Sequence, residues 1–170
     1  MELFANTIYG SFEEVTKRFS HNTAIIYLGE RYNYSELNEM VLTFAASLHK
    51  LGIGKEDRVI TNLYNLPQTL IAWLALQRLG AIPIPVAPVY TAYDLKYMAN
   101  DSGAETILCM DTNLSYVLEV LPETPLKNVI VTNVIDLVPW WKKIIGKGFD
   151  RIPKGKIPTG KDFFSFQKLL

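Results

Sequence analysis

The 170-residue sequence predicts an α/β fold in which helices lie on both faces of a mostly parallel sheet and a β-hairpin precedes the sheet. Two observations support this prediction. Short runs of branched residues alternate with longer segments of helical periodicity, and the connections between them are short. Such alternation favours right-handed crossovers between parallel strands, with the helices covering the sheet.

The hairpin is predicted at Ala24–Leu28 and Arg31–Tyr34, where aromatic and branched residues surround a glycine turn. Ser35 follows as a candidate helix cap, since its hydroxyl can accept from the first backbone N–H groups of a helix. Apolar residues then recur at helical spacing as far as Leu51, which predicts the first helix of the α/β series.

The next predicted strand is Arg58–Leu63, and the helix after it runs from Asn65 to Leu79. This helix is apolar nearly all round, which predicts burial on more than one side. Ala81–Val86 contains two prolines, which cannot donate to a strand ladder. That segment is therefore either a strand of restricted pairing or an extended connection.

Thr91 and Asp94 resemble a capping box that starts the next helix, which ends near Gly103. The last part of the series consists of strands at 106–110 and 128–132. A helix at 113–121 is predicted between them.

Beyond Val134 the periodicity fades, so we expect two parts: an α/β subdomain with its hairpin at 1–134 and a basic extension at 135–170. The charges differ sharply along the chain. Residues 1–139 carry 9 Lys/Arg against 15 Asp/Glu, whereas residues 140–161 carry 7 against 1. Such a basic segment faces anionic lipid or phosphate, or is simply solvated, while the acidic remainder argues against nucleic acid.

Within this extension Trp140 and Trp141 stand next to Lys142 and Lys143. Aromatic side chains that dip into a lipid interface while cations meet headgroups would give such a pattern. The alternative is that the tryptophans pack on the body and the lysines are solvated. The longest apolar run, Leu70–Leu76, is too short to span a membrane, so we expect a cytoplasmic protein in which association with a membrane surface stays open.

The sequence contains no recognisable catalytic constellation or metal-binding set. One cysteine and two histidines argue against a disulfide or a zinc site, and Cys109 is interpreted as a small core residue. Gly155–Lys161 has the spacing of a phosphate-binding loop, but Asp162 follows where that loop needs Ser or Thr. We interpret the segment as a polar loop.

A series of motifs runs in unbroken order from about residue 20 to residue 132: Tyr32–Leu37, Leu51–Val59, Asn65–Pro67, Leu79–Thr91, Leu95–Tyr97 and Asp101–Leu108. In these motifs the chain resembles the adenylate-forming, or AMP-binding, superfamily, and acyl-CoA synthetases in particular. The tail beyond residue 134 is similar to the corresponding region of long-chain fatty-acid ligases. The resemblance implies the first subdomain of the N-terminal domain of such an enzyme.

An enzyme of this family uses ATP, Mg²⁺ and CoA to adenylate a carboxylate and then form a thioester. Its phosphate loop and catalytic residues lie downstream of the region covered here, so the resemblance implies no catalytic, cofactor-binding or metal-binding residue in this chain. The chain alone is then expected to bind no cofactor and to be inactive.

In such enzymes this subdomain forms one wall of the acyl site, which would place Asn65 and Trp73 near a fatty-acid substrate. The expected partner is the remainder of the ligase, in the same or a separate chain, and a homodimer stays open. The alternative function is a non-catalytic module that uses the same fold to bind lipid or a partner.

Overall fold

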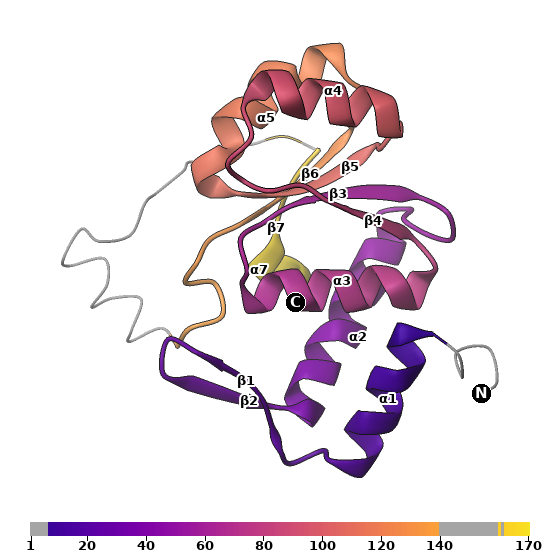
Figure 1. The fold of residues 1–170 in the computed structure, drawn as a ribbon, viewed down its shortest axis with the longest axis vertical. Helices are drawn as coiled ribbons and strands as arrows, with labels where there is room; N and C mark the ends of the chain where they lie inside the picture. Colours follow the sequence, from indigo (N-terminus) through magenta and orange to yellow (C-terminus); the bar gives the residue numbers. More distant parts are fainter. Residues whose placement is uncertain (1–6, 140–159, 161) are drawn as a thin grey trace. The chain divides into compact units, whose positions relative to one another are not determined.

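The computed structural model describes residues 7–139, 160 and 162–170 (Figure 1). The chain divides into two compact units, which are described separately below. The first unit comprises the residues up to Asp57 together with Pro67–Ile82 and Leu170. The second unit comprises Arg58–Leu66 and Pro83–Leu169.

The first unit contains three helices that contact one another and a two-stranded antiparallel hairpin. Its elements are α1 (Ile8–Arg18), β1 (Thr23–Tyr27), β2 (Glu30–Asn33), α2 (Tyr34–Lys50) and α3 (Pro67–Leu79). The predicted hairpin is confirmed. Leu28 and Gly29 both adopt positive φ in its two-residue turn, as a primed turn with the twist of the flanking strands requires.

The N-terminal cap of α2 is Asn33, so the predicted cap at Ser35 is wrong. The Asn33 side chain accepts from the backbone N–H of Glu36 at 2.8 Å, and the Glu36 carboxylate accepts from the backbone N–H of Asn33 at 2.8 Å. This reciprocal pair satisfies two N–H groups that a helix start leaves without partners. Ser35 already lies inside the first turn.

The second unit is built around a five-stranded parallel sheet flanked by helices, as predicted. The strand order is β4-β3-β5-β6-β7, and β3 pairs with β5, β5 with β6, and β6 with β7 in parallel. The strands are β3 (Arg58–Asn62), β4 (Ile82–Pro85), β5 (Thr106–Met110), β6 (Asn128–Thr132) and β7 (Phe163–Ser165). The helices are α4 (Ala92–Ser102), α5 (Leu114–Val120) and α7 (Phe166–Leu169), with the 3-10 helices η2 (Asp111–Asn113) and η3 (Leu121–Glu123) beside α5.

Pro83 and Pro85 lie in β4, which is an edge strand with one neighbour. The structure thus decides between the two interpretations of this segment in favour of a strand of restricted pairing, since prolines are tolerated where no ladder donor is needed. At the other edge, β7 pairs with β6 at Val129, Ile130 and Val131. The sequence does not predict this strand, whose residues fall within the expected basic extension at 135–170.

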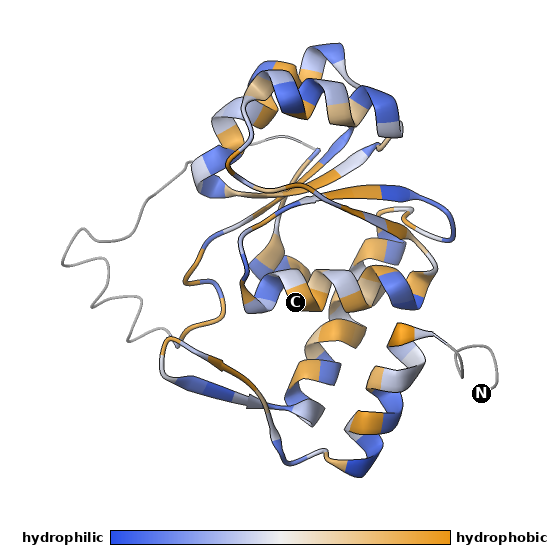
Figure 2. Ribbon diagram, in the orientation of Figure 1, coloured by the Kyte–Doolittle hydropathy of each residue, from blue (hydrophilic) through white to orange (hydrophobic). Residues whose placement is uncertain are grey.

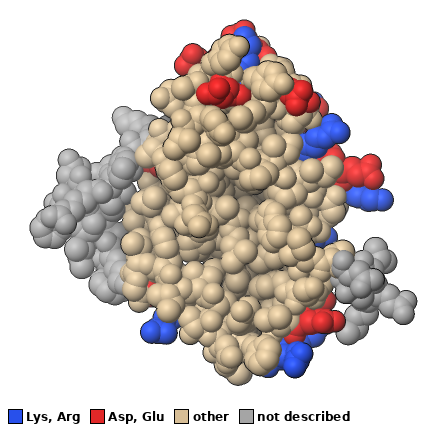
Figure 3. All heavy atoms as spheres, viewed as in Figure 1, with Lys and Arg blue, Asp and Glu red and all other residues tan. Residues whose placement is uncertain are grey.

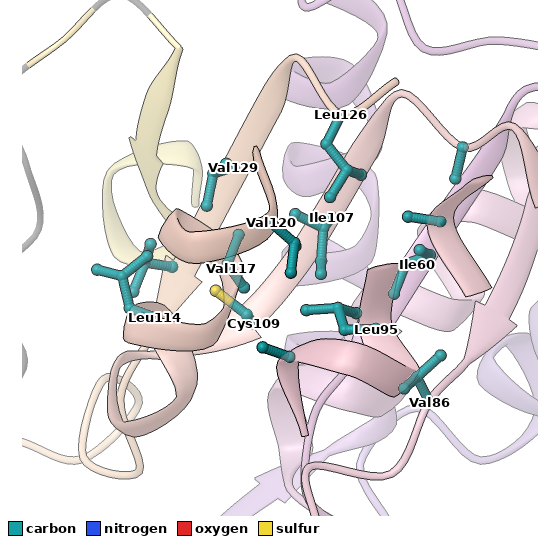
Figure 4. Close-up of a cluster of buried hydrophobic side chains, with 14 residues drawn as sticks. Ile60, Val86, Leu95, Ile107, Cys109, Leu114, Val117, Val120, Leu126 and Val129 are labelled. Carbon is teal, nitrogen blue, oxygen red and sulfur yellow. The ribbon is translucent and has the colours of Figure 1, made fainter. Parts of the chain in front are cut away.

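The core of the second unit lies between the sheet and the helices α4 and α5 (Figure 4). Alternate residues of the strands point into it, and the two helices contribute the opposing side chains. The strands supply Ile60, Ile107, Cys109, Val129 and Val131, and the helices supply Leu95, Ala99, Val117 and Val120. All are at most 3% exposed, and full burial of each Val, Leu or Ile side chain among them contributes roughly 1.5–3 kcal/mol.

On the outer side of these helices charged side chains of both signs are visible over α4 and α5 (Figure 3). Lys96 of α4 forms an ion pair with Glu123 of η3, and the Asn100 side chain donates to the Glu123 carbonyl at 3.1 Å. These contacts join α4 to the end of α5. They are exposed, so their contribution to stability is small.

Candidate functional sites

An apolar groove of about 370 Å³ lies in the first unit, lined by residues of α1, β1, α2 and α3. Its volume falls within the range of small-molecule sites. Most of its lining is apolar, and Ser11 and Tyr34 supply hydroxyl groups. Phe12, Leu37, Leu70 and Trp73 are among the apolar residues that line it.

Helix α3 is apolar on more than one face, and Trp73 is one of its side chains that line this groove. Ile71, Ala72 and Leu76 are 0% exposed and Leu74 is 2% exposed, which confirms the predicted burial on more than one side. Trp73 is only partly buried, and Leu70, one turn earlier, is 37% exposed. Residues three apart share a helix face, so these two side chains border the groove together.

Tyr9 and Arg78 tie α1, which forms one wall of the groove, to α3. The Arg78 guanidinium donates to the Tyr9 hydroxyl at 2.7 Å and lies 5.1 Å from the centroid of the Tyr9 ring. Tyr9 is completely buried, and this burial raises the pKa of its hydroxyl, although the Arg78 charge acts in the opposite direction. Neither α1 nor this contact was among the features predicted from the sequence.

A second, smaller cavity of about 200 Å³ lies in the second unit at the carboxyl ends of the parallel strands. Asp111 follows β5 directly and Asn133 follows β6 directly, and the Asn133 amide donates to the Asp111 carboxylate at 2.6 Å. Ligands of open α/β sheets commonly bind at this edge. The sequence could have indicated that these two residues lie close together, because each of them stands immediately after a predicted strand.

The chemistry of this second cavity is acidic. Asp111 is 8% exposed, and Tyr64, Thr112 and Asn133 supply its other polar groups. No Lys or Arg is among the described residues that line it. The lining therefore favours hydrogen-bond donors over phosphate, which needs positive charge or converging N–H groups.

Cys109 lies in the core of the second unit, as the sequence predicted (Figure 4). Burial, with a smaller effect of the nearby Asp111 charge, raises the pKa of its thiol to about 12. The thiol is therefore protonated at neutral pH. A nucleophilic cysteine needs the opposite shift.

The two residues predicted to line an acyl site are not brought together in either cavity. Trp73 lines the groove of the first unit, whereas Asn65 belongs to the second unit and is exposed in the connection between β3 and α3. Asn65 is not among the residues that line the groove or the acidic cavity.

The predicted surface segment with Trp140, Trp141, Lys142 and Lys143 lies outside the described residues, as does all of Gly155–Lys161 except Gly160. Within the described part of the chain, no three His, Cys, Asp or Glu side chains could hold a metal ion together. No helix of that part is long and apolar enough to cross a membrane.

The sequence and the fold are both similar to known acyl-CoA ligases. Over 161 residues the chain is 33% identical to a long-chain-fatty-acid–CoA ligase of Salmonella typhimurium, a match that covers 91% of this chain and 28% of the relative. The crystal structure of a long-chain-fatty-acid–CoA ligase from Archaeoglobus fulgidus matches with a TM-score of 0.70 at 25% identity, over 72% of this chain and 26% of that one.

An anthranilate CoA ligase, crystallised in complex with anthranoyl-AMP, matches 95% of this chain and 27% of its own with a TM-score of 0.76. At 13% identity this likeness shows the fold alone. The chain thus spans little more than a quarter of the length of these relatives. The family of AMP-binding enzymes matches residues 12–158, so this chain belongs to that family.

Proposed function

We propose that this chain is the N-terminal portion of an ATP-dependent fatty-acid–CoA ligase. In the complete enzyme a fatty-acid carboxylate attacks the α-phosphate of ATP and releases pyrophosphate, and the CoA thiol then displaces AMP from the acyl-adenylate. The observation that carries the proposal is the match of 91% of this chain to 28% of a long-chain-fatty-acid–CoA ligase.

We propose further that the 170-residue chain does not form an acyl-adenylate by itself. Phosphoryl chemistry on ATP needs cations and N–H donors that stabilise the charge of the transferring group. The acidic cavity offers the buried Asp111 carboxylate, which would repel a triphosphate. The sites for ATP, Mg²⁺ and CoA would then come from the remainder of the enzyme.

The groove of the first unit is our candidate for contact with the hydrocarbon of the substrate. Its apolar lining around Trp73 suits an alkyl chain, and each buried methylene contributes about 0.8 kcal/mol. Asn65, in the second unit, stays a separate candidate for contact with the acyl substrate in the complete enzyme. Its exposure leaves it accessible to a ligand or to another part of the polypeptide.

The experiment that tests this function compares two proteins in fatty-acid-dependent exchange of labelled pyrophosphate into ATP. One is the 170-residue chain, and the other is a chimaera in which this chain replaces the matched region of the Salmonella typhimurium ligase. We expect exchange by the chimaera and none by the chain alone. Exchange by the isolated chain, or an inactive chimaera beside an active parent enzyme, would contradict the proposal.

A further inference from the structure

The acidic cavity of the second unit combines a buried carboxylate with apolar walls. Its volume is about 200 Å³, and its residues lie at or just beyond the carboxyl ends of β3, β5 and β6. Figure 2 shows hydrophobic colour along much of β5 and β6, and the polar residues Asp111 and Asn133 follow these strands directly. Met110, Val134 and the ring of Tyr64 supply apolar surface. The volume is below the range typical of drug-sized ligands, so the cavity suits a small molecule.

The exposures of the lining residues distinguish an inner end of the cavity from a mouth. Met110 is 0% exposed and Asp111 is 8% exposed, so these two residues form the inner end. Tyr64 is 44% exposed and Thr112 is exposed, so these two residues lie at the mouth. A ligand that enters from solvent therefore passes an aromatic ring and a hydroxyl group before it reaches the Asp111 carboxylate.

The Asn133 side chain, which contacts this carboxylate, is held in one orientation. Its Nδ2 atom donates to Oδ2 of Asp111 at 2.6 Å, and its Oδ1 atom accepts from the backbone N–H of Ile135 at 3.0 Å. The backbone N–H of Asn133 and the hydroxyl of Thr132 both donate to Oδ2 of Asp136, at 2.9 and 2.8 Å. This network orients the Asp111 carboxylate before a ligand arrives, which lowers the entropic cost of binding.

The charges around the cavity favour a cation. Asn133 donates to two carboxylates, Asp111 and Asp136, and no Lys or Arg is among the described residues that line the cavity. A carboxylate forms its strongest hydrogen bonds with charged donors. The face of an aromatic ring such as that of Tyr64 also attracts a ligand cation. The apolar walls favour an organic cation over a metal ion, since a metal ion needs oxygen ligands on several sides.

We propose that the acidic cavity binds a small organic cation, which carries a primary ammonium group on a short apolar body. The ammonium group donates to the Asp111 carboxylate at the inner end. The apolar body packs against Met110, Val134 and, at the mouth, the ring of Tyr64. The inference does not depend on the proposed function, because every residue that lines the cavity belongs to this chain.

The test is a titration of the 170-residue chain with benzylammonium, followed through the backbone amide signals in ¹H–¹⁵N NMR spectra. Benzyl alcohol, which has a similar shape and no charge, is the comparison probe. We expect saturable shifts at the cavity residues Tyr64, Asp111, Thr112 and Asn133, and binding of benzyl alcohol that is about tenfold or more weaker. Equal affinities for the two probes would overturn the inference. So would an absence of shifts, or shifts spread over the acidic surface of the chain.

Three variants sharpen the test. Asp111→Asn keeps the shape of the side chain but removes its charge, and should weaken the binding of benzylammonium about tenfold or more. Asp101→Asn, at an exposed position near the end of α4, is the matched control and should leave the affinity unchanged. Val134→Phe fills part of the cavity and should weaken the binding of both probes, and it decides the question if Asp111→Asn does not fold. Full affinity for benzylammonium in a folded Asp111→Asn or Val134→Phe variant would refute the site.

Discussion

The Arg78 guanidinium donates a hydrogen bond of 2.7 Å to the hydroxyl of the buried Tyr9 and thereby joins α1 to α3. Because α1 and α3 are two of the walls of the apolar groove, this contact also fixes the shape of that groove. It links residues that are 69 positions apart, so no local sequence pattern reports it.

Replacement of Tyr9 by Phe should destabilise the first unit. The variant keeps the ring beside Arg78 but removes the acceptor, and loss of a hydrogen bond to a charged group costs about 1.5–3 kcal/mol. Urea denaturation followed by circular dichroism measures the change in unfolding free energy. Tyr93→Phe, at a position 82% exposed, is the control and should change little. An unchanged midpoint for Tyr9→Phe would contradict the assigned role.

Because Asn33 and not Ser35 caps α2, substitution by alanine should change the unfolding free energy differently at these two positions. Asn33→Ala should cost about 1 kcal/mol of unfolding free energy, because it removes the side-chain acceptor of the Glu36 N–H group. Ser35→Ala is the matched control, because Ser35 lies inside the helix and does not cap it. A larger loss from Ser35→Ala than from Asn33→Ala, measured by thermal or urea unfolding, would refute the assignment of the cap.

Gly80 follows α3 at a φ of +72°, where an added Cβ would lie 3.4 Å from the Cγ atom of Lys55. Gly80→Ala should therefore destabilise the protein by about 1 kcal/mol or more through backbone strain. Gly54→Ala provides the comparison, since its Cβ would meet nothing within 4 Å and its φ is not positive. Equal unfolding midpoints for the two variants would show that the positive φ of Gly80 carries no cost.

Cys109 should be unreactive toward thiol reagents in the folded protein. Its pKa of about 12 keeps the thiol protonated, and its side chain is buried. Alkylation by iodoacetamide at pH 8 should be about a hundredfold or more faster in denaturing urea than in buffer. Comparable rates in the two conditions would place the thiol at the surface, contrary to the structure.

The same shift makes a prediction about stability at high pH. The folded state holds the Cys109 proton more tightly than the unfolded chain, whose thiol has the ordinary value of 9.0. The contribution of this group to stability is therefore fully present below pH 9 and declines as the pH rises toward 12. Cys109→Ala should lose less stability than the parent chain between those two pH values in urea titrations. An identical loss of stability in the variant and the parent chain would contradict the raised pKa of Cys109.

Most of the order of strands and helices from β1 to β6 could be predicted from the sequence, because these elements have their own periodicity and turn residues. The exception is β4, whose two prolines left it open between a strand and an extended connection. The strands Thr106–Met110 and Asn128–Thr132 coincide with the predicted ranges. Strand β7 has only three residues, which is too short for a recognisable period, and 30 positions separate it from β6. Its pairing with β6 is what identifies it as a strand.

The candidate sites were less predictable, because they depend on residues far apart in the sequence. The groove needs α1, β1, α2 and α3 together, and Trp73 by itself is typical of a core residue as much as of a ligand site. The acidic cavity could have been inferred, since Asp111 and Asn133 each directly follow a strand that the sequence predicts. Their hydrogen bond could not be read from the spacing alone.

The intact mass of this protein, isolated from its native source, decides whether the chain is part of a longer ligase. We expect a mass several-fold above 19.3 kDa, with this chain as the N-terminal portion of a longer ligase polypeptide. A mass of 19.3 kDa, with no second polypeptide of the AMP-binding family purifying alongside, would contradict it. The chain would then act as a separate module.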